Sequence, residues 1–452
     1  MIRAKLKRLL FALWIASFTL TSMAGAERCS LMNKSHLLSL LEKVYLDGDS
    51  VYVVDIYSDF PKYAPVEAKG EGFACVDDAA RAVVFLAKYD EMLNTQADRE
   101  MISGLVKFIL KMQTEDGRFY NFLQKTNGRV LINRTGETSR ASFGWWAARA
   151  IWALGTSALY LKDTDSLLYA QVVESLGRTK PQIDSVLSKF NVEDSSGAPT
   201  WLLFGDGADA SSELVLGLNE AYRATKDSAY LKFSEEFCYG LLKLQRGTCK
   251  EFPFFAFLSN KQEWHAWANS QSAALLDFYT IKPNTKFLRA ALREVDCFLP
   301  RWVGTWFFRE FHSGSTHLNY YAQIAYNIRP ALFSSVKAYQ ITKLEKYRTL
   351  ALLISSWFFG NNIAKTKMYD SATGRCFDGI EDSIHVNINS GAESTIEALF
   401  SMLLLKQADA SACNIKSLSP PFLAAKRFLF NINGKKVVLQ MTKDGFRVII
   451  GR

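Results

Sequence analysis

The sequence of 452 residues lacks the short motifs that mark several large enzyme classes. It has no GxGxxG or GxxxxGK[ST] phosphate loop and no GxSxG nucleophile elbow. The usual sequence evidence for a nucleotide-dependent enzyme or a serine hydrolase is therefore missing. Its seven cysteines form no CxxC pair, which disfavours zinc ribbons and thioredoxin-like redox sites. The five histidines are not clustered with cysteines as zinc ligands would be. We therefore expect neither a metal nor a cofactor.

The sequence also lacks long runs of one charge. The net charge is +9, of which four units come from the first 26 residues, so the remaining chain carries +5. After residue 26, no run of Lys and Arg is longer than two, and basic residues alternate with acidic ones. This pattern is typical of a solvated surface, and we expect no nucleic-acid partner. Binding to an acidic polysaccharide stays open.

Residues 1–26 have the layout of a secretory signal peptide. Four basic residues precede an apolar run from Leu9 to Ala16, and small residues end the segment at Ala26. The run is shorter than the roughly 20 residues of a membrane-spanning helix. We expect a secreted or periplasmic protein with no stable membrane span after cleavage; an uncleaved anchor is the alternative. Glu27 and Arg28 before Cys29 argue against a lipidated cysteine.

An odd number of cysteines leaves at least one free thiol. In an exported protein one or more disulfides are plausible, although a chain of this length does not need them for stability. Cys238 and Cys249 are the likeliest local pair.

Long apolar segments with helical periodicity indicate one main α-helical domain, which we place at residues 27–410. Helical hairpins recur roughly every 55 to 65 residues, with short turns inside each pair. Six hairpins closing into a ring form an all-α (α/α)6 toroid; an irregular bundle or an open solenoid is the alternative. The predicted helices cover residues 33–46, 78–94, 98–113, 140–161, 164–176, 180–190, 211–225, 227–245, 265–280, 284–299, 319–341, 344–359 and 391–407. The first would complete the wall begun by the last.

The final residues, 411–452, have a different pattern. After Pro420-Pro421, three short alternating runs are joined at Asn433-Gly434 and Asp444-Gly445, both hairpin signals. We expect a small C-terminal β segment, too short to be stable alone and therefore docked on the toroid.

The segment from Glu71 to Tyr89 contains the first candidate site. Asp77 and Asp78 stand where a helix begins, and only one is needed as an N-cap. The proximity of two like charges raises the pKa of one carboxyl toward that of a general acid, and Arg81 could instead neutralise the pair. We prefer Asp78 slightly.

Aromatic residues stand beside polar ones at further helix starts. Tryptophan faces stack on sugar rings. Trp146 and Trp152 are more readily explained as core, and a lone histidine is more often structural than catalytic. Asp206 and Asp209 lack the other ligands of a calcium loop. The candidates for substrate contact are Arg81, Arg140, Trp145, Trp264, His265, Trp267, Tyr320, Tyr321 and Gln323.

The densest polar segment runs from Met368 to Leu405. The predicted loop before the final helix, from Met368 to Ser390, is long, and structural loops of such length are uncommon without a function. Asp378 and Glu393 are candidate acids, and Asn387 and Asn389 are candidate substrate ligands. Ser390 could cap the final helix, leaving Glu393 as a capping-box or inward-facing carboxylate.

Together, CVDDAARA, DGRFYNF, ARAIWALG, SWFFGNN, YDSATGRCFDGI and VNINSGAESTIEALFSMLL resemble the six-hairpin glycosidase superfamily. The resemblance covers roughly Gly72 to Leu405 and implies an (α/α)6 toroid. It does not name a substrate, because this fold hosts hydrolases, lyases, epimerases and phosphorylases. The Asp-Asp pair is similar to that of unsaturated glycuronyl hydrolases, which implies an acid/base role for Asp77 or Asp78. The Asp-containing motif of inverting endoglucanases is missing.

Our leading hypothesis is an exported glycoside hydrolase that cleaves a poly- or oligosaccharide. Hydrolysis needs a protonated acid and a carboxylate, for which Asp77 or Asp78 and Glu393 are the first choices and Glu137 and Asp378 the substitutes. One alternative is a lyase on a uronate-containing glycan, with Tyr320, His317 and Arg329 as candidates. Another is a non-catalytic glycan-binding envelope protein. The oligomeric state stays open.

Overall fold

The computed structural model describes residues 31–408, 415–418 and 423–451, and residues 32 onward form one compact unit. The predicted signal peptide, Cys29, Cys413 and Pro420-Pro421 lie outside the described residues. None of the described helices has the length and apolarity that a membrane crossing requires.

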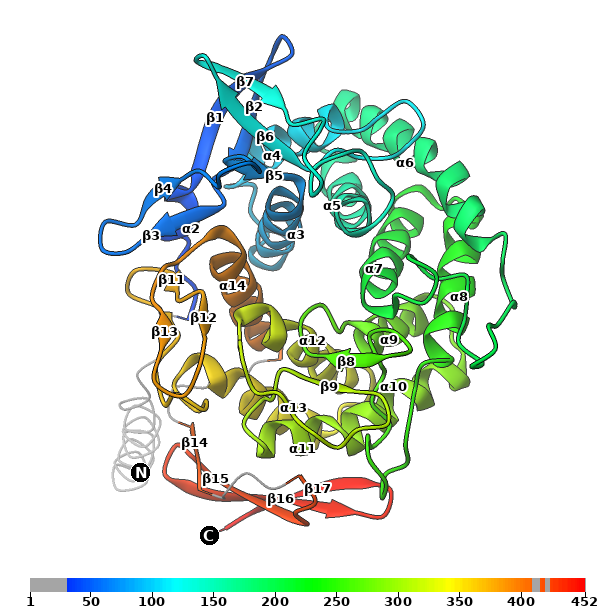
Figure 1. The fold of residues 1–452 in the computed structure, drawn as a ribbon, viewed down its shortest axis with the longest axis vertical. Coiled ribbons are helices and arrows are strands. Elements are labelled where there is room, and N and C mark those ends of the chain that lie inside the picture. Colours follow the sequence, from blue (N-terminus) through cyan, green and yellow to red (C-terminus); the bar gives the residue numbers. More distant parts are fainter. Residues whose placement is uncertain (1–30, 409–414, 419–422, 452) are drawn as a thin grey trace, which may run out of the picture. The chain divides into compact units, whose positions relative to one another are not determined.

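Six helices of the described chain pack side by side in an inner ring, which closes where the last one meets the first (Figure 1). Most of their residues are buried around the whole circumference, because the ring contacts a second layer of helices outside it. The inner helices are α3 (Val76–Leu93), α5 (Trp145–Leu161), α7 (Ala208–Thr225), α9 (Gln271–Ile281), α12 (Ala325–Thr342) and α14 (Ala392–Gln407).

An outer helix follows each of the first five inner helices and packs against it. The outer helices are α4 (Arg99–Lys111), α6 (Ser166–Leu187), α8 (Ser228–Leu242), α10 (Thr285–Cys297) and α13 (Glu345–Ser355). The two helices predicted at 164–176 and 180–190 are one continuous helix, α6, with Pro181 inside it. Short helical segments add α11 (Leu299–Gly304) and the 3-10 turn η1 (Ser356–Phe358).

Inner helices α5 and α7 approach closely at two glycines. A Cβ on Gly217 would lie 2.6 Å from the backbone nitrogen of Trp152, and one on Gly155 would lie 2.7 Å from the carbonyl oxygen of Gly217. Larger side chains would push these helices apart and widen the ring.

The predicted helix at 33–46 is wrong beyond its first turn. Helix α2 (Ser35–Ser39), which packs against α14, is followed by the antiparallel strands β1 (Leu41–Leu46) and β2 (Asp49–Val54). Asp47 and Gly48 join the strands with φ of 44° and 86°, the conformation that two-residue hairpins favour. The Asp-Gly pair between alternating apolar residues was the sequence signal for a hairpin.

Short strands carry the loops at the end of the ring where the inner helices begin. They are β3 (Tyr57–Asp59), β4 (Ala64–Val66), β5 (Ala74–Cys75), β6 (Phe122–Thr126), β7 (Arg129–Ile132), β8 (Glu263–His265), β9 (Glu310–His312), β10 (Tyr369–Asp370), β11 (Arg375–Cys376), β12 (Gly379–Ile380) and β13 (Val386–Asn387). The long segment after Met368 is therefore two small hairpins, β10–β11 and β12–β13.

The predicted Cys238–Cys249 pair is wrong. Cys249, in the loop after α8, is bonded to Cys297 at the end of α10, and Cys238 is a buried free thiol. A disulfide that closes a loop of 48 residues stabilises a protein by about 4 kcal/mol in the chain-entropy account. Nearness in sequence misled the prediction, because Cys238 points into the core from α8.

The C-terminal β segment forms a four-stranded antiparallel sheet rather than the predicted three strands. Its strands are β14 (Ile415–Ser417), β15 (Arg427–Ile432), β16 (Lys435–Thr442) and β17 (Gly445–Ile450). The reversal at Asn433-Gly434 matches the hairpin signal. The sheet packs against α10, α11 and α13, with Phe428 fully buried against Gly304 and Phe446 beside Tyr347.

We predict that Gly304→Ala weakens the docking of this sheet. The added Cβ would stand 2.2 Å from the ring of Phe428, so the ring must move, and overpacking of this kind costs about 1–3 kcal/mol of unfolding free energy. Urea unfolding followed by circular dichroism measures the loss.

Gly177→Ala is the matched control, because Gly177 lies in α6 with no atom near its missing Cβ. This substitution should be neutral or stabilise the protein by about 0.5–1 kcal/mol. Equal stability of the two variants would contradict tight packing at Gly304.

Candidate functional site

A cavity of about 470 Å³ opens where inner helices α3, α12 and α14 begin. The positive ends of α3 and α14 point toward it, which favours carboxylates there. It gathers several of the predicted site residues, namely Asp77, Asp78, Arg81, Trp267, Asp378, Asn387 and Glu393. Its other lining residues are Ile56, Tyr57, Cys75, Phe122, Arg149, Ile324, Tyr326, Gly391 and Ser394.

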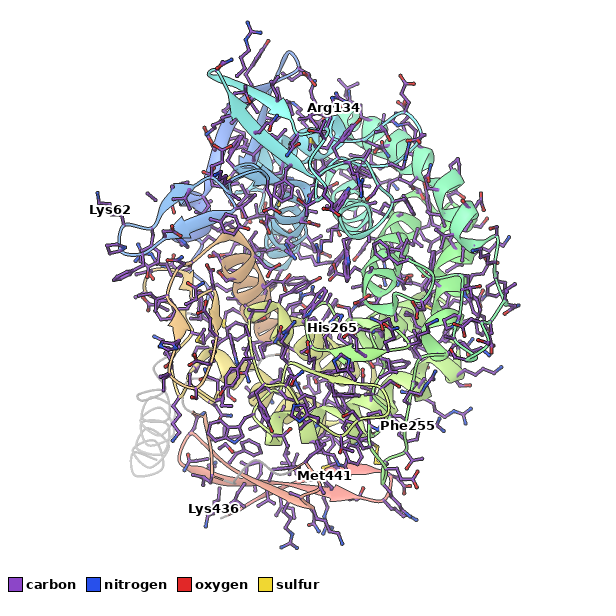
Figure 2. All side chains as sticks on the ribbon, viewed as in Figure 1. Lys62, Arg134, Phe255, His265, Lys436 and Met441 are labelled. Carbon is purple, nitrogen blue, oxygen red and sulfur yellow. A yellow bond between two sulfur atoms is a disulfide. The ribbon has the colours of Figure 1, made fainter. Side chains whose placement is uncertain are left out.

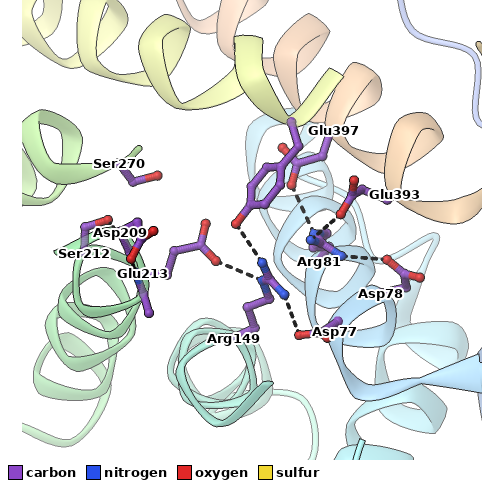
Figure 3. Close-up of polar contacts among 12 residues, drawn as sticks. Asp77, Asp78, Arg81, Arg149, Asp209, Ser212, Glu213, Ser270, Glu393 and Glu397 are labelled. Atoms are coloured by element: carbon purple, nitrogen blue, oxygen red, sulfur yellow. Dashed lines mark hydrogen bonds and ion pairs between the residues drawn. The ribbon is translucent and has the colours of Figure 1, made fainter. Parts of the chain in front are cut away.

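Arg81 joins the two ends of the inner ring at this cavity (Figure 3). It lies one turn after Asp78 on α3, and its guanidinium donates to Asp78 Oδ1 and to Glu393 Oε2, each at 2.7 Å. Its Nε lies 3.3 Å from Glu397 Oε1. One cation thus holds three carboxylates from two helices.

Two of the three carboxylates that contact Arg81, those of Glu393 and Asp78, differ in their exposure to solvent. The Glu393 side chain is 40% exposed and faces the cavity, whereas that of Asp78 is 4% exposed and also contacts the thiol of Cys75. Burial raises the pKa of both carboxyls, and Arg81 opposes the rise. Glu393 is therefore an acid that keeps its proton more readily than usual while open to a ligand.

Asp77 faces the cavity from the other side of α3 and is held by a second arginine. Arg149 Nη1, from α5, lies 2.6 Å from Asp77 Oδ1, and the Asn121 amide donates to Oδ2 at 3.1 Å. Arg149 also contacts Glu213 at 3.1 Å and the Tyr326 hydroxyl at 3.0 Å. The Asp77 side chain is 17% exposed, so a ligand in the cavity can reach it.

A buried arginine closes the network behind the cavity. Arg329, on α12, lies 2.8 Å from Glu213 and 2.7 Å from Glu397, and all three side chains are almost fully buried. Burial opposes ionisation of Glu213, but Arg329 and Arg149 outweigh it and hold its pKa below the usual value. For Glu397 burial prevails over Arg329 and Arg81, and its pKa is raised.

Asp378 fixes the start of α14 rather than pairing with an arginine. Its Oδ1 accepts from the backbone of Gly391 at 2.7 Å and from the Ser394 hydroxyl at 2.6 Å. Burial raises its pKa. Ser390 is not the cap that was predicted: Gly391 precedes α14, and the Ser390 hydroxyl instead accepts from the backbone of Cys376 at 3.2 Å.

A second cavity, of about 420 Å³, adjoins the first through Trp267, which lines both. The Trp267 ring lies 5.6 Å from that of Trp145, whose ring lies 6.4 Å from that of Phe204. Phe204 is 66% exposed and has φ of 58°, a strained conformation for a bulky residue. The three rings form an aromatic wall, here called the Trp145–Trp267–Phe204 wall.

His265 lies under this wall, in strand β8 rather than at the start of a helix as predicted. Its ring stacks on Trp267 at 3.8 Å. Its Nδ1 lies 3.0 Å from the Trp267 carbonyl oxygen, and its Nε2 lies 3.0 Å from Asp209 Oδ2. Both ring nitrogens therefore face acceptors of the protein itself, and the residue is 3% exposed.

Two predicted substrate ligands are buried away from both cavities. Trp264 is 2% exposed and packs against Phe298, Trp302, Phe308 and Phe311, so its ring belongs to the core. Gln323 is fully buried; its amide donates to the Trp306 carbonyl oxygen and accepts from the Trp357 indole. Neither can contact a sugar from these positions.

Other predicted residues lie on the surface beside the site. Glu137 and Arg140 are exposed on the connection before α5 and line neither cavity. Tyr320, Tyr321 and Asn389 are also outside the two linings; Asn389 accepts from the backbone of Phe60 at 2.9 Å.

Four residues of the candidate site and its ion-pair network were not predicted from the sequence, because they lie within apolar helical runs. These are Arg149, Glu213, Tyr326 and Glu397, each on an inner helix. A charged residue surrounded by apolar neighbours in a helix buried on all sides must find a partner, and that was the available signal.

Within the described residues, no group of three or more His, Cys, Asp or Glu side chains is arranged to hold a metal ion.

No protein-family description and no curated protein matches the sequence. Solved structures do match. Cellobiose 2-epimerase from Bacillus thermoamylovorans B4167 is 13% identical with a TM-score of 0.57, over 82% of this chain and 95% of that one. A D-mannose isomerase is 12% identical with a TM-score of 0.55, over 83% and 95%. Cellobiose 2-epimerase from Spirochaeta thermophila DSM 6192 is 11% identical with a TM-score of 0.55, over 82% and 92%.

These TM-scores show a shared fold and confirm the predicted (α/α)6 toroid. The predicted C-terminal β segment is confirmed by strands β14 to β17 of the structure.

We predict that Arg329→Met destabilises the protein by about 3–5 kcal/mol at neutral pH, because Glu213 and Glu397 lose their shared buried partner. The loss should shrink as the pH falls, because protonation of either carboxyl reduces the excess negative charge that Arg149 and Arg81 alone must balance. Chemical unfolding at several pH values measures both effects.

Arg118→Met is the control. Arg118 pairs with Asp116 on the surface, where both side chains are 47% exposed, so its loss should cost less than about 1 kcal/mol. A similar cost for both variants would contradict the role of the buried network.

Proposed function

We propose that this chain is a carbohydrate-active enzyme, and specifically a glycoside hydrolase. One observation carries the proposal: Glu393 and Asp77, from the two helices that close the ring, open onto one cavity and are each held by a different arginine. Glycoside hydrolysis requires two carboxyl groups that flank the scissile bond and differ in protonation.

Glu393 is the general acid in this proposal. Burial raises its pKa and the neighbouring charges of Asp78 and Asp77 add to the rise, while Arg81 and Arg149 oppose it, so Glu393 keeps its proton to a higher pH than an ordinary glutamate does. Asp77, bound to Arg149 and Asn121, is the carboxylate that activates water or attacks the sugar. Asp78, which the sequence slightly favoured over Asp77 as the catalytic acid, is buried in this proposal and helps to raise the pKa of Glu393.

The substrate is an oligo- or polysaccharide that extends across Trp267. One sugar ring occupies the carboxylate-lined cavity, and the next stacks on the Trp145–Trp267–Phe204 wall, whose outer ring is largely exposed. Asp206, Lys261 and Gln262 line the second cavity and supply hydrogen bonds to sugar hydroxyls.

The lyase alternative has less support from the geometry. Of its three candidates, Arg329 is engaged by two buried carboxylates, His317 is exposed, and Tyr320 lines neither cavity.

A sugar epimerase or isomerase is the second candidate, because solved structures that share the fold carry those names. In the cavity, Arg81 and Arg149 could stabilise the negative charge that develops when a proton is removed beside a carbonyl group. The engaged nitrogens of His265 weigh against that residue as the base.

We predict that Glu393→Gln and Asp77→Asn each lower kcat about 100- to 10,000-fold without loss of folding, because each removes one of the two carboxyl groups. The assay incubates the chain with plant, microbial and uronate-containing glycans and detects new reducing ends. Unsaturated products would indicate a lyase, and deuterium taken up from solvent at carbon 2 without cleavage would indicate an epimerase.

Glu137→Gln is the matched control, since this exposed glutamate lines neither cavity and its loss should leave activity unchanged. Full activity in both cavity variants would refute the assignment. Glycan binding without any product, in the unaltered chain, would favour the non-catalytic alternative.

We predict that Phe204→Ala raises KM about 3- to 10-fold for the cleaved oligosaccharide, through loss of one stacking contact. It should leave KM unchanged for a small aryl glycoside of the same sugar, which does not reach the wall. Tyr45→Ala is the control, because Tyr45 is 69% exposed on β1 and lines neither cavity. An equal change for both substrates would place Phe204 outside the substrate path.

We also propose that the chain is exported and acts outside the cytoplasm, on the strength of the leader at residues 1–26.

A further inference from the structure

The charge of the chain is unevenly divided between the toroid and the C-terminal sheet. Residues 32–408 contain 41 Lys and Arg against 42 Asp and Glu, so the toroid is nearly neutral. Residues 415–451 contain seven Lys and Arg and a single acid, Asp444. The positive charge that follows the leader is thus concentrated on one small sheet.

The sheet has two different faces. Its inner face is buried against the helices and carries Phe428, Phe430, Val437, Leu439, Met441 and Phe446. Side chains alternate along a strand, so the intervening residues form the opposite, solvent-facing side. Lys436 projects from this side, away from the helices (Figure 2).

The strand register arranges the solvent-facing side in rows. Arg427 and Arg447 flank Gln440, to which Arg447 donates at 2.9 Å. The next row is aliphatic and consists of Leu429, Val438 and Ile449, the last 40% exposed. Lys436 stands opposite Asn431 in the third row. We call these rows the basic face of the sheet.

Acidic side chains do not neutralise this surface. Lys426, Arg427, Lys435, Lys436 and Arg447 are exposed and form no ion pair within the described residues; only Lys443 pairs, at 3.9 Å, with Asp444. Such a surface attracts anions, and the attraction is stronger where several cations lie side by side.

The composition of the face distinguishes between possible polyanions. The phenylalanines of its described strands, Phe428, Phe430 and Phe446, are buried on the inner face, so within the described residues the solvent-facing side presents no aromatic ring for stacking on sugars or bases. Instead, an aliphatic row lies between basic residues. Aliphatic side chains flanked by Lys and Arg are typical of surfaces that bind anionic lipid headgroups and insert shallowly at the interface.

We propose that the basic face of the sheet docks this protein onto an anionic lipid bilayer. Arg427, Lys436 and Arg447 contact headgroup phosphates, while Val438 and Ile449 lie against the interface. The sheet thereby holds the toroid beside the membrane. Residues of the toroid, and none of the sheet, line the substrate cavity, so membrane binding and catalysis can be measured independently.

Co-sedimentation with vesicles tests the proposal on the chain that begins at Glu27, without the apolar leader. Vesicles of phosphatidylglycerol mixed with phosphatidylcholine should bind the protein, and added salt should release it. Each basic residue near an anionic surface contributes about fivefold to partitioning, so the triple variant Arg427→Gln, Lys436→Gln, Arg447→Gln should bind on the order of 100-fold more weakly.

The control is the triple variant Lys62→Gln, Lys162→Gln, Lys189→Gln, which removes the same charge from exposed lysines of the toroid and should bind as the unaltered chain does. If the sheet variant fails to fold, the single change Lys436→Glu at an exposed position should still weaken binding roughly 25-fold.

Equal binding to vesicles of phosphatidylcholine alone would overturn the proposal, as would unchanged binding by the sheet variant. Binding to polygalacturonate but not to the anionic vesicles would identify the face as a site for acidic polysaccharides instead. Hydrolase activity of the sheet variant reports separately on the substrate cavity, so failure of either proposal leaves the other measurable.

Discussion

A chain of buried ion pairs organises the centre of this molecule. Arg81, Arg149 and Arg329 each contact carboxylates from neighbouring inner helices, and Glu213 and Glu397 lie between them. Buried charges without partners would each cost several kcal/mol, so arrangements of the inner helices that leave these charges unpaired are disfavoured. The network therefore favours the relative rotation of the helices that brings its partners together.

The two carboxyl groups proposed to act on the substrate stand at the two ends of this network. Arg81 presents Glu393 and Arg149 presents Asp77, each from a rigid helix end rather than from a loose loop. Both are bound to a guanidinium, but their other surroundings differ, since burial raises the pKa of Glu393 whereas Asp77 also accepts from the Asn121 amide. One continuous set of contacts thus supports the ring and separates the roles of the two acids.

Much of the toroid could be predicted because its helices are long and strongly patterned. The Asp-Asp pair and Glu393 were also found, since they stand at helix starts. Long-range contacts were not: Cys297 lies 48 residues from Cys249, and Arg149 and Glu397 resemble surface residues until their helices are known to be buried on all sides. The opposite error was made for Trp264, which was predicted to contact substrate but is buried in the core. An aromatic residue beside a loop can do either, and the sequence does not distinguish the two.

The ring closes between helices from opposite ends of the chain. Arg81 in α3 and Glu393 in α14 are separated by 312 residues, so this contact forms only when the last inner helix is present. Contacts of such separation form late, because the intervening chain must first be ordered. A chain that crossed a membrane unfolded would therefore assemble this centre only after its final inner helix had arrived and packed against the first.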